Sequence, residues 1–406
     1  MKRDCPVCGS VGPRRVLHRQ HFFDGPLGNG YDVVVCKKCG AGFADGIPSQ
    51  PSLDRYYAKQ SKYEYSQSGG EESPYDFKRF EAIADQVIPL LKSGSARVLD
   101  VGCATGGLLS VFKKRGFENL LGLDPSPACA KAARRLHGVE VRSTTLAQMP
   151  GWQERFDLVL VVGVLEHLRN VQPAMRTIAN LLRDDGLLYC AQPDVTTFAD
   201  CVNAPYQQFS VEHINFFSEQ SLSRLIATSG LAPRRTWHWM IEWREGITDS
   251  VVSGIYSSLV TADLPEPKFP SRQSSTGNSE FAVAYDYQTE SSLKRYLELC
   301  RKGDEKLIAV VDCLVASQEP ILIWGAGTLT RRLLSSTRLP EANIVAFVDS
   351  DPGVQGRRLA GREILSPMQI GANVETIVVG SKAFKQEIIA IIRDQLTLTN
   401  KVIFLA

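Results

Sequence analysis

A strand, a tight turn and the start of a helix follow one another in Val98-Leu99-Asp100-Val101-Gly102-Cys103-Ala104-Thr105-Gly106-Gly107. Such a turn needs small residues because the backbone must approach a ligand closely where the helix begins. A glycine-rich turn is a weak signal by itself. Here Asp124 ends the next predicted strand about 20 residues later, where a carboxylate can accept hydrogen bonds from both hydroxyls of a ribose. Together the two features predict a nucleotide-binding unit.

Predicted strands alternate with predicted helices around this turn. The strands are expected at 97–101, 120–123, 139–141, 156–162 and 186–191, and the helices at 108–115, 127–136, 173–182 and 218–229. Apolar strands separated by helices indicate a parallel sheet that is covered on both faces. We expect further strands of this domain near 234–242.

A second unit of the same plan is predicted in the last quarter of the sequence. It follows a long helix expected at 291–316 and contains a strand at 321–324, the turn Gly325-Ala326-Gly327, a strand that ends before Asp349, and apolar strands at 376–379 and 402–405. The turn predicts a cradle for a substrate's phosphates at the start of a helix, and Asp349 is positioned to bind a ribose. The alternative is a scaffold domain that binds nothing.

Four cysteines form two Cys-x-x-Cys pairs, Cys5 with Cys8 and Cys36 with Cys39, and a glycine directly follows each pair. This spacing is typical of a structural zinc site. Four thiolates close the coordination sphere of Zn²⁺, so we expect the metal to hold the fold and to take no part in chemistry.

The composition excludes several classes of protein. The 406 residues are enough for two or three domains, and the formal net charge is only +2, which does not favour nucleic acid or an anionic membrane as partner. There is no apolar run of about 18 residues to span a membrane, and the first residues lack the apolar core of a signal peptide. We therefore expect a cytoplasmic protein with reduced thiols that binds neither nucleic acid nor membranes.

The turn, Asp124, the block 156–167 and the segment 181–186 together resemble the Rossmann-like S-adenosylmethionine-dependent methyltransferases. A dehydrogenase-type dinucleotide fold is the alternative, but the turn is not Gly-x-Gly-x-x-Gly. The resemblance implies S-adenosylmethionine as cofactor. It implies that the cofactor is bound by Asp100, Gly102, Cys103, Ala104, Gly106, Asp124, Pro125, Thr145, Leu146, Val162 and Gly163. We interpret Cys103 as a small filler residue and not as a nucleophile.

With the cysteine pairs and the second unit included, nearly the full chain resembles the sugar C-methyltransferases, which act on nucleotide-linked deoxysugars. Two motifs support this: Phe209-Ser210-Val211-Glu212-His213-Ile214-Asn215-Phe216-Phe217-Ser218, like the family's Glu-His-x-x-Tyr-Phe block, and Trp324-Gly325-Ala326-Gly327, like its C-terminal glycine turn. The implied fold class is α/β, with a Rossmann-like methyltransferase domain, an N-terminal four-cysteine zinc knuckle and a second small Rossmann-like domain. The implied domains are a zinc-binding domain at 1–50, a tyrosine-rich hinge and helix at 51–90, the methyltransferase domain at 91–245, a linker with strands at 246–284, and a substrate-binding nucleotide-fold domain at 285–406.

Methylation of a carbon next to a ketone requires a base to remove a proton and a donor to hold the enolate oxygen. The resemblance implies His213 as base, Glu212 as its orienting partner, and His167 and Tyr65 as assisting groups. It further implies a nucleotide-linked sugar as substrate, bound with the help of Tyr63, Gly325, Gly327 and Asp349 in a monomer or homodimer. The alternatives are purely structural roles. His167 would only shape a pocket, Glu212 and His213 would form a structural ion pair, and the tyrosines would only pack.

Two positions depart from the family pattern, because Ser210 and Phe216 stand where tyrosine is common. A serine cannot reach or donate as a phenol does, which weakens the case for an enolate. O-methylation of a glycan or secondary metabolite therefore stays open, with His213 deprotonating an alcohol. RNA methylation is a third option, but it would need a basic surface that the net charge does not indicate.

Overall fold

The computed structural model describes residues 2–59, 71–149, 151–201, 203–258, 272–274, 284–371 and 376–405. The chain forms two compact units, each assembled from three separate segments. Unit 1 consists of Met1–Leu17, Val33–Phe198 and Glu212–Leu293, and unit 2 consists of His18–Asp32, Ala199–Val211 and Lys294–Ala406. Neither unit is a continuous stretch, in contrast to the successive domains expected from the sequence.

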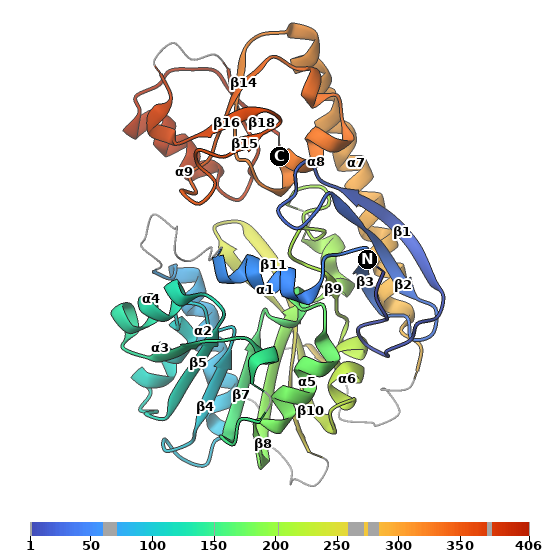
Figure 1. The fold of residues 1–406 in the computed structure, drawn as a ribbon, viewed down its shortest axis with the longest axis vertical. Coiled ribbons are helices and arrows are strands. Elements are labelled where there is room, and N and C mark those ends of the chain that lie inside the picture. The colour runs from blue at the N-terminus through green and yellow to red at the C-terminus, as the bar shows by residue number, and fades with distance from the viewer. Residues whose placement is uncertain are drawn as a thin grey trace. The chain divides into compact units, whose positions relative to one another are not determined.

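Unit 1 contains an eight-stranded sheet in the order β12-β10-β11-β8-β7-β4-β5-β6 (Figure 1). The strands are β4 (Val98–Val101), β5 (Leu120–Asp124), β6 (Glu140–Ser143), β7 (Phe156–Val162), β8 (Leu182–Pro193), β10 (Leu231–Arg244), β11 (Ile247–Ser258) and β12 (Arg272–Ser274). Strands β4 to β8 are parallel, and the order reverses between β4 and β7. In open α/β sheets, ligands bind at such a reversal, outside the carboxyl ends of the strands.

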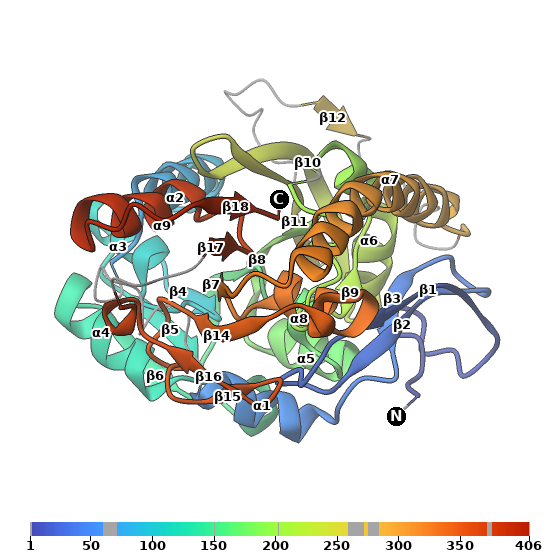
Figure 2. The same cartoon turned by 90° about the horizontal axis from the view of Figure 1, so that it is seen from above.

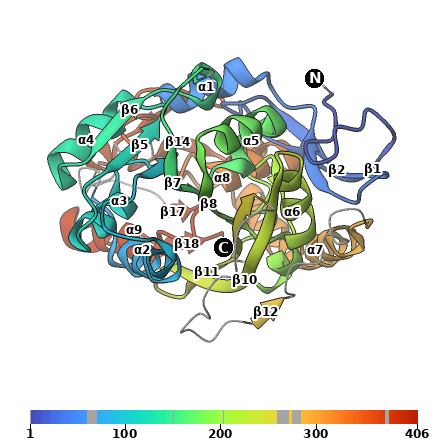
Figure 3. The same ribbon diagram turned by 90° about the horizontal axis from the view of Figure 1, so that it is seen from below.

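Helices cover both faces of this sheet, as the apolar strands predict (Figure 3). One face carries α2 (Pro74–Val87), α3 (Gly107–Lys114) and α4 (Pro127–His137), and the other carries α5 (Val171–Asn180) and α6 (Glu219–Ala227). Side chains alternate along β4, so that Val98 packs in one core while Leu99 and Val101 pack in the other. The expected α/β fold with a parallel sheet is confirmed.

The sheet continues beyond residue 245, where the sequence placed the end of the domain. Strand β11 pairs with β10 on one side and with β8 on the other, so it lies inside the sheet and not in a linker. Its serine and glycine residues obscure the strand pattern in the sequence. Gly254 is needed there, because a Cβ at this position would lie 2.8 Å from the ring of Tyr256.

A separate four-stranded sheet has the order β1-β2-β3-β9. Its strands are β1 (Arg14–His21), β2 (Gly30–Cys36), β3 (Gly42–Asp45) and β9 (Asn215–Phe216), and helix α1 (Gln50–Lys59) follows β3. Within unit 1, β9 pairs with β3 in antiparallel register, with Asn215 opposite Phe43. The strand that begins two residues after His213 thus belongs to a sheet that begins in the cysteine-containing segment.

Unit 2 contains a six-stranded sheet in the order β15-β16-β14-β13-β17-β18 (Figure 2). The strands are β13 (Ile321–Trp324), β14 (Ile344–Val348), β15 (Arg358–Leu359), β16 (Arg362–Leu365), β17 (Thr376–Val379) and β18 (Val402–Phe404). Residues 307–315 of α7 (Tyr287–Ser317) and helix α8 (Thr328–Ser336) pack on one face, and α9 (Lys385–Ala390) packs on the other. None of the helices in the described part of the chain is both long and apolar enough to cross a bilayer.

Candidate active site

The glycine turn between β4 and α3 is held by the backbone. The amide of Gly102 donates to the carbonyl of Leu123 at 2.7 Å, and Gly102, Ala104 and Gly106 have φ angles of +73°, +49° and +82°. A Cβ at Gly102 would also lie 2.5 Å from Cγ2 of Val164. Glycine is therefore required at position 102 both by conformation and by close packing.

Asp124 closes the turn from the neighbouring strand. One of its oxygens, Oδ2, accepts a hydrogen bond from the amide of Ala104 at 3.1 Å, and Oδ1 accepts one from the amide of Ser126 at 2.9 Å. The carboxyl group lies at the carboxyl end of β5, where the sequence predicts contact with a ribose. Burial raises the pKa of Asp124.

Asp100 is a second acid beside the turn and is only 3% exposed. Burial, with a smaller contribution from the charge of Asp124, raises the pKa of Asp100 to about 8. Within the described residues, no protein group donates a hydrogen bond to its carboxyl. Two acids that are both reluctant to ionise favour a cationic ligand, which would stabilise their charged forms. S-adenosylmethionine carries a sulfonium and an ammonium group, so these residues fit the predicted cofactor.

The other predicted cofactor residues lie at the carboxyl ends of the parallel strands. Thr145 and Leu146 begin a short 3₁₀ helix after β6, and Pro125 follows β5. Val162 is the last residue of β7, and Gly163 follows it. Cys103 is buried, burial raises the pKa of its thiol, and its sulfur occupies the space that a Cβ at Gly122 would fill. This geometry supports the filler interpretation of Cys103.

Glu72 also contacts the turn, and the sequence analysis did not identify it. Its side chain is 4% exposed, Thr105 Oγ1 donates to Oε1 at 2.6 Å, and Nε2 of His137 lies 2.8 Å from Oε2. Although burial opposes the effect, hydrogen bonds from His137 and Thr105 lower the pKa of Glu72. A Cβ at Gly107 would lie 2.5 Å from Glu72 Oε1. This close contact explains why a second glycine, Gly107, follows Gly106. The pair Gly106-Gly107 is a trace of the contact in the local sequence.

A second cluster forms where β7 ends. Glu166 and His167 lie in a 3₁₀ turn, Leu165–His167, and His213 comes from the segment before β9. The imidazole rings of His167 and His213 have centroids 5.1 Å apart and are inclined by 67°. A carboxylate oxygen of Glu166 and one nitrogen of each histidine all lie within 4.8 Å of one another. The structure thus brings together two predicted catalytic residues that are far apart in the sequence.

One tyrosine of α1 contacts this cluster, and the tyrosine before it contacts Glu212. The hydroxyl of Tyr57 lies 3.1 Å from Nδ1 of His167, and the hydroxyl of Tyr56 donates to Glu212 Oε1 at 2.8 Å. Burial, followed by the charge of Glu212, raises the pKa of Tyr57 well above its usual value, so Tyr57 stays a phenol and can donate. The tyrosines that the sequence singled out, Tyr63 and Tyr65, lie outside the described residues.

The two positions that depart from the family pattern offer no phenol. The backbone carbonyl of Ser210 accepts a hydrogen bond from the hydroxyl of Tyr31 at 2.8 Å within unit 2. Phe216 is 1% exposed in β9 and packs against Phe198 with ring centroids 6.3 Å apart. Phe216 is therefore part of a core.

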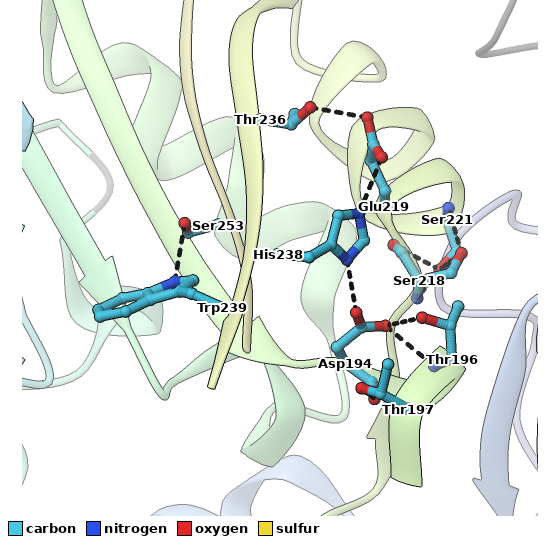
Figure 4. A network of polar contacts seen from close by, with 10 residues as sticks. All are labelled: Asp194, Thr196, Thr197, Ser218, Glu219, Ser221, Thr236, His238, Trp239 and Ser253. Atoms are coloured by element: carbon cyan, nitrogen blue, oxygen red, sulfur yellow. Dashed lines mark hydrogen bonds and ion pairs between the residues drawn. The ribbon is translucent and has the colours of Figure 1, made fainter. Parts of the chain in front are cut away.

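His238 lies in a polar network of unit 1 (Figure 4). Its Nδ1 is 2.6 Å from Asp194 Oδ2 and its Nε2 is 3.0 Å from Glu219 Oε2. Hydrogen bonds to Asp194 and then to Glu219 raise the pKa of His238 to about 9. At neutral pH this imidazole is a cation with both nitrogens occupied, which excludes it as a general base.

The four paired cysteines meet in unit 1. Their sulfurs approach within 3.6 Å for Cys5 and Cys39 and within 3.8 Å for Cys8 and Cys36, and all four lie within 4.8 Å of one another. Tetrahedral Zn²⁺ with Zn–S bonds of about 2.3 Å separates its sulfurs by about 3.8 Å. None of these cysteines is in a disulfide. The cluster therefore fits the predicted structural zinc ion.

The turn of unit 2 has a carboxylate of its own. The amide of Gly325 donates to the carbonyl of Val348 at 2.7 Å, and Asp349 accepts hydrogen bonds from the amides of Ala326 at 2.8 Å and Asp351 at 2.9 Å. Gly327 precedes α8 and has open space around the position of a Cβ. The predicted residues Gly325, Gly327 and Asp349 thus lie around one turn.

Comparison with known proteins agrees with this geometry. A family model described as a methyltransferase domain matches residues 75–235. Residues 75–235 form a methyltransferase domain. A different model, described as C2185-like, N-terminal, matches residues 317–403 of unit 2.

The methyltransferase domain has curated relatives named ubiquinone biosynthesis O-methyltransferase. The protein from Agrobacterium fabrum is 39% identical over 100 residues, which are 23% of this chain and 40% of that protein. The protein from Bradyrhizobium diazoefficiens is 35% identical over 101 residues, 23% of this chain and 39% of that protein. The chain thus spans about 40% of the length of these relatives. Among solved structures, the [4+2]-cyclase SpnF is 13% identical with a TM-score of 0.42, covering 53% of this chain and 98% of SpnF.

Proposed function

We propose that this protein transfers a methyl group from S-adenosylmethionine to a small molecule that must first lose a proton. One observation carries the proposal. The methyltransferase domain joins a turn with one buried acid, Asp100, and one partly buried acid, Asp124, to a two-histidine cluster at the end of the adjacent strand β7. The acids select a cationic donor, and the histidines offer a base.

The chain's own residues would divide the work as follows. S-adenosylmethionine, when bound, supplies an electrophilic methyl group. His213 removes the proton of the acceptor, and His167 and Tyr57 stabilise the negative charge that develops, since the hydroxyl of Tyr57 contacts His167. Because His238 is a cation between two carboxylates, it is excluded as the base, which favours the His167–His213 cluster.

For the acceptor we propose a nucleotide-linked ketosugar, methylated at the carbon next to its ketone. Unit 2 supports this substrate class, because Asp349 clasps its turn in the manner of a ribose-binding carboxylate. Tyr57 supports the enolate route, since it supplies a phenol that Ser210 and Phe216 lack.

O-methylation of a hydroxyl is the second candidate. The names of the relatives, which are O-methyltransferases, favour it. The two reactions differ in one measurable step: incubation of the ketosugar with enzyme in D₂O, without methyl donor, would exchange the proton next to the ketone only on the carbon route. Mass spectrometry of the recovered sugar distinguishes them.

The test of the general proposal is replacement of the base. His213→Ala should lower the rate of methyl transfer at least about 100-fold, the range for loss of a general base, while affinity for S-adenosylhomocysteine stays within a few-fold. Labelled methyl donor with a panel of nucleotide-linked ketosugars and hydroxyl acceptors gives the rate. The exposed His21, replaced by Ala, is the matched control. A nearly normal rate in His213→Ala would rule out this base.

A further inference from the structure

Arg3 is a buried arginine, 6% exposed, that reaches from the cysteine-containing segment to the segment after His213. Its Nη2 donates to the carbonyl of Ile214 at 2.6 Å and to Oδ1 of Asn215 at 2.7 Å. Its Nε donates to the carbonyl of Ala44 at 3.0 Å, and Nη1 donates to that of Arg169 at 3.2 Å. All the nitrogens of the guanidinium are thus used to bind backbone or amide oxygens of three other segments.

Asn215 extends this contact to the second histidine. Its Nδ2 donates to the carbonyl of Leu165 at 2.6 Å and to that of Leu168 at 2.8 Å, which are the residues on either side of Glu166 and His167. In addition, the amide of Ile214 donates to the carbonyl of Glu166 at 2.8 Å. Asn215 therefore ties the turn of His167 to the strand that follows His213.

The arrangement cannot be reproduced by another cation. A guanidinium presents five donors in a rigid plane, whereas an ammonium offers three from a single point and cannot bridge four acceptors in different directions. The carbonyl of Ile214 would keep the amide of Ala44 at 2.9 Å, but loss of the guanidinium would remove the hydrogen bond to Oδ1 of the buried Asn215. A buried acceptor left without a partner costs about 1–3 kcal/mol. The loops would move to recover this hydrogen bond, and the two imidazoles would move with them.

We propose that Arg3 and Asn215 are positioning residues that set the distance and angle between the imidazoles of His167 and His213. The inference rests on the proposed function, because it matters for catalysis only if these histidines handle the acceptor's proton. It makes the N-terminal segment part of the catalytic apparatus. A misplacement of about 1 Å can reduce a rate on the order of 100-fold.

The test uses two variants and one matched control in the full-length protein. Arg3→Lys keeps the charge and removes the fork, and Asn215→Ser keeps Arg3 but removes the bridge to Leu165 and Leu168. The control is Arg14→Lys, because Arg14 lies in the same segment and contacts Asp45 and the carbonyl of Arg3, but no hydrogen bond joins it to either histidine-bearing segment within the described residues.

The primary readout is the NMR spectrum of the histidine rings with S-adenosylhomocysteine bound, which is tractable because the chain has six histidines. We expect the ring signals of His167 and His213 to shift in Arg3→Lys and Asn215→Ser while those of His137 and His238 stay. The rate of methyl transfer should fall about 10- to 100-fold, with unchanged affinity for S-adenosylhomocysteine. Arg14→Lys should leave the spectrum, rate and affinity unchanged.

Unshifted His167 and His213 signals in both variants would overturn the proposal, as would equal shifts of all the histidines in Asn215→Ser. If Arg3→Lys does not fold, Asn215→Ser decides alone. The spectrum needs no substrate, so it tests the positioning proposal separately from the proposed function. A normal rate of methyl transfer in His213→Ala would contradict the proposed function.

Discussion

The two units share one arrangement of hydrogen bonds around their glycine turns, which we call the clasp: an aspartate at the end of one strand accepts from two backbone amides. In unit 1, Asp124 accepts from the amides of Ala104 and Ser126, and in unit 2, Asp349 accepts from the amides of Ala326 and Asp351. In both units the first glycine of the turn donates at 2.7 Å to the carbonyl that precedes the aspartate. The clasp is therefore compatible with a nucleotide in either unit and does not distinguish between the ligands of the two turns.

The difference lies two residues before the glycine. Unit 1 has Asp100 there, buried, with its pKa raised to about 8, and unit 2 has Ile323, which is fully buried. An acid that burial keeps partly protonated is costly for folding unless a ligand uses it. The acid therefore distinguishes a site for a cationic nucleoside from a turn that has no such preference.

The largest expected difference between the two turns is the effect of removing the aspartate's charge on the affinity for S-adenosylhomocysteine. Asp124→Asn should weaken binding of S-adenosylhomocysteine about 100-fold, because hydrogen bonds to a charged group contribute about 1.5–3 kcal/mol each. Asp349→Asn is the matched control and should leave that affinity unchanged. Isothermal titration calorimetry measures both. Equal losses in the two variants would mean that the units do not differ as proposed.

The second test concerns pH. With an ordinary pKa of 3.8 and a value of about 8 in the free protein, Asp100 is mostly protonated at pH 7. A cationic ligand favours the carboxylate, so binding of S-adenosylmethionine should release close to one proton. Affinity should rise up to about tenfold per pH unit and level off above pH 8.

Calorimetry in buffers with different ionisation enthalpies counts the protons released on binding. Asp100→Asn has no proton to release and should show a flat pH dependence over this range. Proton release that persists in this variant would assign the effect to another group.

The smallest expected difference is in the free energy of unfolding of two glycine-to-alanine variants, one in each turn. Gly102→Ala should lower the free energy of unfolding by about 1–2 kcal/mol, because position 102 has a φ of +73° and its Cβ would meet Val164. Gly327→Ala should cost less, about 0.5–1 kcal/mol, because its φ is −83° and the space is open, so that only the preference for glycine over alanine at a helix N-cap is lost. Urea denaturation followed by circular dichroism gives both values. A larger cost at Gly327 would indicate that something in unit 2 requires a glycine there.

Most of the fold could be predicted from the sequence because its strands are apolar runs between helices. The turn, Asp124 and the strand at 156–162 each carry a local pattern, and the structure has them as expected. Strand β11 could not be assigned in the same way, since its apolar residues are interrupted by serines and Gly254.

The site was only partly predictable, and for a different reason. His167 and His213 stand in recognisable motifs, but the residues around them do not. Arg3, Glu72 and Asn215 act through contacts with distant segments, and no local pattern in the sequence records those contacts. Tyr56 and Tyr57 lay in a segment read as a hinge, although it forms helix α1.

The hydrogen bond from Arg3 to Ile214 joins residues 211 positions apart. During synthesis the cysteine-containing segment leaves the ribosome long before its partner strand β9 exists. Contacts between residues so far apart in the sequence slow folding. Until β9 has been synthesised, the edge of β3 that pairs with it has no partner. The first residues of the chain are therefore expected to reach their native pairing late, after the parallel core has already formed.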